Sequence, residues 1–160
     1  MSLEKNLLSF SSDFELNVSK NNKVKILIID ATEKKILLAL IFNKNIYTST
    51  YINSKKNYDK LVTIIDKFLS KYKTSLNIIN RIYVNRGPGS YAGVRNSISI
   101  VKAIHLSKKI DYYSFSCKDF NDIENKYISL DISNKIYNLK NIPNLCEKFN
   151  IKKNLIKPLY

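Results

Sequence analysis

A nearly continuous apolar run, KVKILIID at residues 23–30, constrains the fold of this chain more than any other feature of its sequence. Strands that are covered on both faces of a sheet contain unbroken runs of Val, Ile and Leu, because neither side of the strand meets water. We therefore predict a central, buried strand that ends in the carboxylate of Asp30. The chain of 160 residues, 44% of them hydrophobic, is large enough to bury a core around such a strand.

Two further strands are expected directly after the first. A turn at Ala31–Lys35 leads into a second apolar run, Ile36–Phe42. The residues Asn43–Asn45 then predict a hairpin turn, because asparagine tolerates the backbone conformations that tight turns require. The third strand, Ile46–Ile52, alternates Tyr with Ser and Thr and is therefore expected nearer the edge of the sheet.

Helical periodicity begins after these strands. Apolar residues recur with a 3.6-residue period within residues 57–72, which predicts an amphipathic helix. A fourth strand is expected at Ile78–Val84, a second helix over residues 90–107 with Ser90 as its cap, and a fifth strand at Ile110–Phe115. This order of elements, with a meander of three strands first, predicts an α/β fold of the ribonuclease H-like and actin-like half-domain type, with a mixed sheet of about five strands.

The rest of the chain is expected to depend on this domain. We divide the chain into an N-terminal extension (residues 1–22), the α/β domain (23–116) and a C-terminal part (117–160). The last part holds only about 45 residues, too few for an independent core. Within it we expect a hairpin over residues 126–139 and a short helix over Asn144–Asn150.

Charge and cysteine content leave the partners open. There are 27 Lys and Arg against 13 Asp and Glu, a net charge of +14, which suggests RNA binding. The lysines are scattered and only three of the cations are Arg, so we interpret the charge as compositional bias, with a weak RNA-attracting surface as the alternative.

No apolar run approaches the roughly 18 residues of a membrane span. Two cysteines, Cys117 and Cys146, without metal spacing predict reduced thiols and a cytoplasmic protein.

A strand–loop–helix junction, NRGPGS at residues 85–90, holds two of the three glycines. Glycine permits positive φ, proline stiffens the bend, and the first turn of the following helix offers N–H groups that can bind an anion. The pattern is not a P-loop, which needs Gly-Lys-Ser/Thr, nor a dinucleotide fingerprint, whose third glycine would stand at Ala92. We favour a tight turn that lets the helix dock on the sheet, with anion binding as the alternative.

This junction resembles the signature of the TsaB (YeaZ) family, in which Arg-Gly-Pro-Gly-Ser is followed by Phe/Tyr-Thr-Gly-Leu/Val-Arg. The opening strand with Asp30 is similar to the first strand of that family, residues 126–137 to the hairpin that opens its second domain, and residues 157–160 to its C-terminal Pro-x-Tyr. Ala92 stands where the family usually has threonine. The family motif residues present here are Arg86, Gly87, Pro88, Gly89, Ser90 and Arg95.

The resemblance implies an actin-like ATPase fold and a non-catalytic scaffold role in making N6-threonylcarbamoyladenosine in transfer RNA. It also implies pairing with a catalytic TsaD-like subunit, an assembly joined by a TsaE-like ATPase, and contact with tRNA only through that complex. No cofactor is expected for this chain alone, and a homodimer is an alternative pairing. Because the second domain of the family is longer, residues 117–160 are interpreted as its remnant.

In the family the pairing surface is a helix pair that corresponds to residues 57–72 and 90–107. Small side chains spaced four residues apart on the second helix would let another helix approach closely. Two tyrosines are expected to act as aromatic anchors. The predicted partner-binding residues are the anchors Tyr58 and Tyr91, the small-residue row Gly93, Ser97 and Val101, and the helix residues Leu61 and Ile65.

A catalytic function would need groups that converge. The single histidine, His105, is interpreted as structural, and the histidine pair with which TsaD-like proteins bind metal is not found. The strongest alternative function is a ribonuclease H-like, metal-dependent nuclease of the Holliday-junction-resolvase type, which also begins with a strand ending in aspartate. Asp30 has the position of the first metal ligand; the other candidate ligands, which do not clearly converge, are Asp59, Asp66, Asp111 and Asp131.

Overall fold

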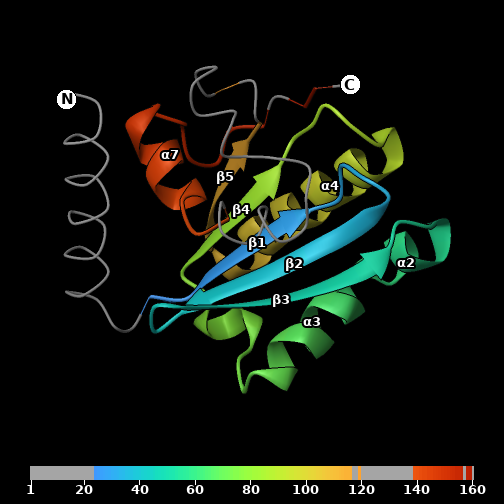
Figure 1. Cartoon of the computed structure of the whole chain (residues 1–160), viewed down its shortest axis with the longest axis horizontal. Helices are drawn as coiled ribbons and strands as arrows, with labels where there is room; N and C mark the ends of the chain where they lie inside the picture. The colour runs from blue at the N-terminus through green and yellow to red at the C-terminus, as the bar shows by residue number, and fades with distance from the viewer. Residues whose placement is uncertain (1–23, 117–118, 120–138, 157, 160) are drawn as a thin grey trace, which may run out of the picture.

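The computed structural model describes residues 24–116, 119, 139–156 and 158–159, which build a five-stranded mixed sheet (Figure 1). Three strands form an antiparallel meander and the other two run parallel to the first strand. The strands are, in spatial order, β3 (Asn45–Ile52), β2 (Lys35–Phe42), β1 (Ile26–Asp30), β4 (Arg81–Asn85) and β5 (Asp111–Phe115). The predicted five-stranded α/β architecture is confirmed.

Helices cover both faces of this sheet (Figure 1). The described helices are α2 (Lys55–Asp59), α3 (Leu61–Lys71), α4 (Tyr91–Lys108) and α7 (Ile142–Lys148). The side chains of α3 and α4 share one hydrophobic cluster on one face, while α7 belongs to a second cluster on the other face. Within the described residues, no helix combines the length and the apolar character needed to cross a bilayer.

The alternation of side chains along β1 explains its position at the centre. Leu27 and Ile29 belong to the cluster beneath α3 and α4, whereas Ile28 belongs to the cluster beneath α7. All three side chains are fully buried, as the unbroken apolar run predicts for a strand with two covered faces. The strand ends at Asp30, which is 2% exposed, so this carboxylate lies in the protein interior.

Most predicted elements are confirmed, with three differences. The helix expected over residues 57–72 is two helices, because α2 ends at Asp59 and α3 begins at Leu61. The fourth strand begins at Arg81 rather than Ile78, since residues 76–78 form a 3₁₀ turn. The expected short C-terminal helix is α7, which begins and ends two residues earlier than predicted.

Some predictions remain open and one turn is confirmed in detail. Asn43 and Lys44 have φ of 50° and 63°, the left-handed pair that a two-residue hairpin between β2 and β3 requires. The hairpin expected over residues 126–139 lies outside the described residues apart from Leu139. The division at residues 22 and 116 stays a prediction.

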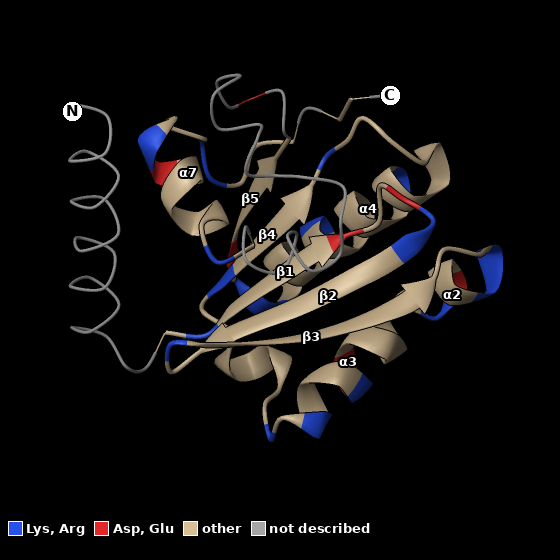
Figure 2. Cartoon of the chain, viewed as in Figure 1, with Lys and Arg blue, Asp and Glu red and all other residues tan. Residues whose placement is uncertain are grey.

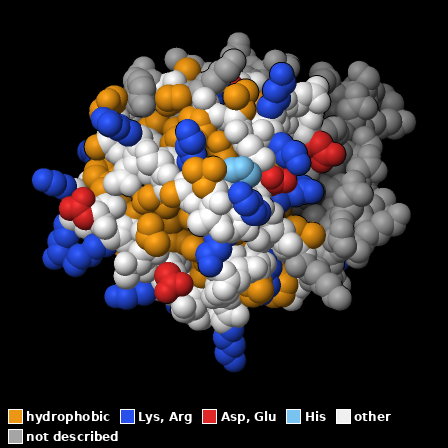
Figure 3. All heavy atoms as spheres, turned by 180° about the vertical axis from the view of Figure 1, so that it is seen from behind, with side chains coloured by type: hydrophobic (Ala, Val, Ile, Leu, Met, Phe, Trp, Pro, Cys, Tyr) orange, Lys and Arg blue, Asp and Glu red, His pale blue; other side chains and the backbone are white. Residues whose placement is uncertain are grey.

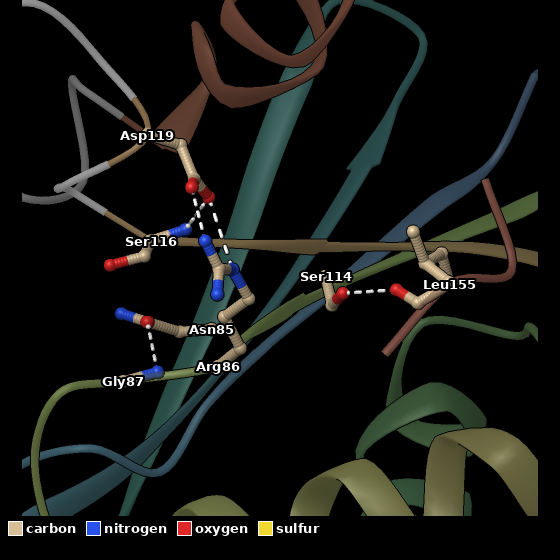
Figure 4. Close-up of polar contacts among 7 residues, drawn as sticks. All are labelled: Asn85, Arg86, Gly87, Ser114, Ser116, Asp119 and Leu155. Carbon is tan, nitrogen blue, oxygen red and sulfur yellow. Dashed lines mark hydrogen bonds and ion pairs between the residues drawn. The ribbon is translucent and has the colours of Figure 1, made fainter. Parts of the chain in front are cut away.

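The C-terminal segment lines the outer edge of β5. The amide of Asn154 donates to the carbonyl of Tyr112 (2.7 Å), and the amide of Tyr112 donates to Asn154 Oδ1 (2.9 Å). Further along, Ser114 Oγ donates to the carbonyl of Leu155 at 2.6 Å (Figure 4). These bonds satisfy backbone groups that an open strand edge would leave available for association.

Candidate functional site

The motif loop, defined here as residues 85–90, begins with a buried polar network. Asn85 Nδ2 donates to Asp30 Oδ2 at 3.2 Å. Figure 4 shows the second bond of this side chain, in which Asn85 Oδ1 accepts from the amide of Gly87 at 3.1 Å. The other carboxylate oxygen of Asp30 accepts from the amide of Thr32 (3.0 Å) and from its hydroxyl (2.6 Å). The network therefore ties the ends of β1 and β4 together through groups that are 2% to 7% exposed.

The glycines of this region are required by close approaches of the chain to itself. Gly87 has φ of 99°, a conformation that side chains disfavour, and a Cβ atom there would lie 2.3 Å from the carbonyl oxygen of Leu159. A Cβ atom at Gly93 would lie 2.0 Å from the carbonyl oxygen of Ala31. The predicted reason for the glycines, a turn that docks the helix on the sheet, agrees with these contacts.

Ser90 caps α4 as predicted. Its Oγ accepts from the amide of Gly93 (3.3 Å) and lies 3.2 Å from the hydroxyl of Tyr58 in α2. Its amide donates to the carbonyl of Thr32 at 2.7 Å, which fixes the start of the helix to the turn after β1. The cap side chain is thus engaged within the chain itself.

Arg86 links the motif loop to the chain that follows β5. Its Nε donates to Asp119 Oδ2 at 3.1 Å, and its Nη2 forms an ion pair with the other carboxylate oxygen (Figure 4). The amide of Ser116 donates to Asp119 Oδ2 at 2.8 Å. Both ion-pair side chains are mostly buried, 13% and 16% exposed, so this guanidinium is committed to a structural contact. A small cavity of about 140 Å³ lies beside the pair, against Asn150 and Lys152.

A second hollow, of about 370 Å³, lies between the turn after β1 and the start of α4. Its lining residues are Thr32, Glu33, Lys34, Asn53 and Ser90. Asn53 Nδ2 donates to the carbonyls of Ala31 (3.0 Å) and Glu33, which holds the β1–β2 turn against the end of β3. This turn is the platform on which the first residues of α4 rest.

The structure places five of the seven predicted partner-binding residues in the core of the chain. The buried residues are Leu61, Ile65, Gly93, Ser97 and Val101. They lie in the core beneath α3 and α4, and the four with side chains of their own are 0% exposed. The row of small residues does permit a close approach, but the approaching group is the chain's own sheet and the turn after β1. A partner on these helices would have to contact their neighbours instead.

The remaining two predicted residues lie nearer the surface. Tyr91 is 56% exposed at the first turn of α4, and Tyr58 is half-buried in α2. Large apolar side chains that the prediction missed accompany Tyr91: Val62 on α3 is 51% exposed and Leu106 on α4 is 61% exposed. The signal that could have found them is an apolar residue outside the buried stripe of each helix.

We call this exposed surface of α3 and α4 the outer helix face. Its apolar members are Val62, Tyr91 and Leu106, with the half-buried Ile64 and Ile100. The view from behind the sheet shows hydrophobic patches interrupted by Lys and Arg side chains (Figure 3). Exposed apolar side chains on helices that cover the same side of a sheet favour a protein-binding surface there.

The groups considered for catalysis are placed separately. Asp30 lies at the carboxyl end of β1, Asp111 at the opposite end of the parallel β5, and Asp59 and Asp66 on α2 and α3. Asp131 lies outside the described residues. The described part of the chain contains no group of three His, Cys, Asp or Glu side chains that could hold a metal ion. The candidate carboxylates in the described part of the chain therefore do not converge where the nuclease alternative requires.

His105 and Cys146 have structural surroundings. His105 Nδ1 lies 2.9 Å from the carbonyl oxygen of Ile110, and its ring meets Tyr112 edge-on at 5.4 Å. Cys146 is on the buried side of α7, and this burial raises the pKa of its thiol well above its usual range, as is typical of an unreactive core cysteine. The structural interpretation of the histidine agrees with these contacts.

Comparison with known proteins finds similarity to proteins named TsaD and TsaB. A family model described as "TsaD: tRNA N6-adenosine threonylcarbamoyltransferase" matches residues 46–116. The tRNA threonylcarbamoyladenosine biosynthesis protein TsaB of Buchnera aphidicola from Schizaphis graminum is 32% identical over 91 residues, which cover 57% of this chain and 43% of that protein. Its counterpart from Acyrthosiphon pisum is 31% identical over 77 residues, covering 44% and 35%. The chain thus spans less than half the length of these relatives.

Solved structures give the same result for the fold. YeaZ from Pseudomonas aeruginosa superimposes with a TM-score of 0.54 at 19% identity, covering 58% of this chain and 44% of that one. This likeness confirms the predicted actin-like, ribonuclease H-like half-domain. The sequence relatives and the structural neighbour agree, and the motif that carries the resemblance stands at the end of β4 as expected, so this part of the chain is similar to proteins of the TsaB (YeaZ) family.

Proposed function

We propose that this chain is a non-catalytic scaffold in the N6-threonylcarbamoyladenosine modification of tRNA and that it pairs with a TsaD-like catalytic subunit through the outer helix face. The observation that carries the proposal is the exposure of Val62, Tyr91 and Leu106 on two helices that cover the same face of the sheet. A TsaE-like ATPase would join the same assembly, which would be the route to tRNA. The cellular site of this activity would be the cytoplasm.

The family comparison supports a partner of similar build. The TsaD family model matches residues 46–116, a span that contains both α3 and α4. Two related half-domains present related helix faces, and such faces can pair about an approximate twofold axis, each helix pair packing on the other. The same argument allows a homodimer as the alternative pairing.

The chemistry of the outer helix face supports pairing energetically. Burying a large apolar side chain that was exposed contributes roughly 1.5–3 kcal/mol. Val62, Tyr91 and Leu106 are each more than half exposed, so a partner that covers them gains several such contributions. Ala92 and Ala103 are small, exposed residues of α4, so a helix of the partner could approach α4 closely at these positions.

The test is co-purification with a TsaD-like subunit and measurement of its affinity. Leu106→Asp and Val62→Asp place charges in the proposed contact and should weaken pairing at least about tenfold each. Leu155→Asp is the matched control, since Leu155 is 43% exposed and lies on the C-terminal segment beside β5 rather than on α3 or α4. Pairing that survives both helix variants, or that is equally sensitive to the control, would show that the contact lies elsewhere.

Changes in the buried row are unsuitable for this test. Gly93→Arg and Ser97→Arg would place a long, charged side chain in the core beneath α4. Loss of pairing in those variants would report loss of the fold. Circular dichroism of Leu106→Asp and Val62→Asp should match the unmodified chain, because neither change touches a buried residue.

A further inference from the structure

Cations gather at the end of the sheet where its three parallel strands begin. Ile26 at the start of β1 pairs with Arg81 at the start of β4, and Arg81 pairs with Asp111 at the start of β5. The β2–β3 turn lies at this end too, because Ile41 near the end of β2 pairs with Ile26. Figure 2 shows Lys and Arg where β1 and β4 begin and at this turn.

The ends of two helices complete this region. Lys25 Nζ donates to Thr74 Oγ1 at 3.2 Å, which places the chain after α3 beside the start of β1. Lys108 Nζ, at the end of α4, donates to Asn77 Oδ1 at 2.8 Å in the same connection. We call this region the basic end of the sheet; it is formed by residues 24–26, 42–45, 70–81 and 108–112. Its cations, all exposed except the half-buried Lys25, are Lys25, Lys44, Lys71, Lys73, Arg81, Lys108 and Lys109.

Little negative charge balances these cations. Within the segments of the basic end, all of them described, the one carboxylate is that of Asp111. Its oxygens accept from Asn154 Nδ2 at 2.7 Å and from Lys153 Nζ at 3.2 Å, so a cation outside these segments already pairs with it. At the opposite end of the sheet, Glu33 and Asp59 lie among the lysines of the β1–β2 turn and of α2. The lysines that are scattered in the sequence are therefore concentrated, without matching carboxylates, at one end of the sheet.

The chemistry of the basic end favours a nucleic acid over a membrane surface. Lys and Arg bind nucleic acids by replacing the counterions of the phosphates. Proteins that lie on a membrane combine cations with several apolar side chains that enter the lipid. Among the described segments of the basic end, the large hydrophobic side chain that is exposed is that of Ile78, at 48%. A single such side chain offers little for insertion.

We infer that the basic end of the sheet binds the phosphate backbone of a structured RNA, so that this chain contacts tRNA directly and not only through its partner. The inference rests on the proposed function for the choice of RNA and adds a surface of this chain to it. Phosphate contacts fix position and orientation but read no sequence, so the basic end would position tRNA rather than select it. The cations of the basic end and the apolar residues of the outer helix face are different residues, and each set can be changed separately.

The test is titration of a fluorescent, unmodified tRNA transcript with the full chain alone, followed by anisotropy between about 50 and 300 mM NaCl. Lys44, Lys73 and Lys109 have φ of 63°, 52° and 58°, a left-handed conformation that asparagine adopts readily. Lys44→Asn, Lys73→Asn and Lys109→Asn together therefore remove three charges with little strain on the backbone. This triple variant should bind tRNA about tenfold or more weakly at about 0.1 M salt, and the slope of log K against log salt should become shallower by about 2.

A matched control removes three charges at the opposite end of the sheet. Lys34→Gln, Lys55→Gln and Lys56→Gln change exposed positions in the β1–β2 turn and at the start of α2. This variant should keep the tRNA affinity within about twofold. Equal effects of the two triple variants, or no tRNA binding by the unmodified chain at about 50 mM NaCl, would overturn the inference. Binding to phosphatidylserine-containing vesicles but not to tRNA would overturn it in favour of a membrane surface.

Pairing with the TsaD-like subunit separates this inference from the proposed function. The triple variant of the basic end should pair as the unmodified chain does, because Val62, Tyr91 and Leu106 are unchanged. If tRNA binding does not depend on the basic end but Leu106→Asp still weakens pairing, the proposed function stands and only the direct RNA contact is lost. If Leu106→Asp has no effect either, both fall.

Discussion

The motif loop and the outer helix face meet at the start of α4, yet they are built in opposite ways. The polar groups of the loop bond to the chain itself, as Asn85 does with Asp30, and Gly87 lies against the backbone of another segment. The outer helix face instead exposes apolar side chains such as Leu106 together with cations such as Lys102. The comparison teaches that the most recognisable stretch of the sequence builds the fold, while the surface proposed to bind a partner consists of less conspicuous residues.

Two neighbouring residues of α4 give the sharpest test of this difference. Gly93→Ala should be strongly destabilising, because the added Cβ would lie 2.0 Å from the carbonyl oxygen of Ala31 and α4 would have to move off the β1–β2 turn. We expect a loss of about 3 kcal/mol or more in the free energy of unfolding, measured in urea. Ala92 is exposed one residue earlier, so Ala92→Leu should change that free energy by less than about 0.5 kcal/mol.

Equal stability of Gly93→Ala and Ala92→Leu would show that the motif loop and the outer helix face do not differ at the start of α4. It would mean that the start of α4 is not seated on the turn after β1. In the partner assay the larger effect should come from Ala92→Leu, because this change alters the exposed surface of α4. Those molecules of Gly93→Ala that remain folded should bind the partner with unchanged affinity, since residue 93 is buried.

Carboxylates give a second comparison between the two regions. Asp30→Ala removes the acceptor of three hydrogen bonds in a site that is 2% exposed and leaves the amide of Asn85 without that partner. The expected loss of stability is about 2–3 kcal/mol. Asp66→Ala, on the exposed side of α3, should cost less than about 0.5 kcal/mol. Thermal unfolding of both variants measures the difference, and a mild effect of Asp30→Ala would show that the network does not stabilise the junction of β1 and β4.

Much of the fold could be predicted because its signals are local. The apolar run before Asp30, the asparagine turn at residue 43 and the Ser90 cap each specify a piece of backbone from a few adjacent residues. The Arg86–Asp119 ion pair has no such signal, because it depends on how the chain after β5 returns to the end of β4. The split of the first long helix at Lys60 was missed since the apolar period continues across it.

The candidate site was predicted less well for a geometric reason. A row of small residues spaced by four positions looks the same whether the helix packs on a partner or on its own sheet. Only the position of the Ala31 carbonyl beneath Gly93 shows that the row faces inward. Similarly, Val62 and Leu106 are exposed on the same side of the sheet because α3 and α4 both cover that side, and no spacing within either helix reveals this arrangement.

The opposite side of the sheet should respond to alkaline pH. Burial raises the pKa of the Tyr83 hydroxyl beneath α7 well above its usual range, and burial raises the pKa of the Cys146 thiol in the same way. Since both groups stay protonated in the folded state, their contribution to stability is complete below the unfolded pKa values, about 8.5 for Cys and about 10 for Tyr. Stability should fall above those values by up to about 1.4 kcal/mol per pH unit and group.

Tyr83→Phe isolates this effect from the rest of the chain. The variant keeps the ring that stacks on Tyr113, with centroids 4.9 Å apart, but has no hydroxyl to ionise. Its unfolding free energy should decline less steeply than that of the unmodified chain between about pH 10 and 11. Parallel curves would show that the hydroxyl ionises without unfolding, which would contradict its buried position.

The smallest expected effect concerns a hydrogen bond between α2 and the motif loop. The hydroxyl of Tyr58 in α2 lies 3.2 Å from Ser90 Oγ in the motif loop, and that oxygen also caps α4. Tyr58→Phe should cost about 0.5–1 kcal/mol, and Ser90→Ala about 1 kcal/mol because the cap is lost as well. A double-mutant cycle on the unfolding free energy should give a coupling of about 0.5 kcal/mol or more. If the coupling is zero, α2 moves independently of the loop. In that case α3 and α4 alone would position the outer helix face, and Tyr58→Phe should leave the affinity for a TsaD-like subunit unchanged.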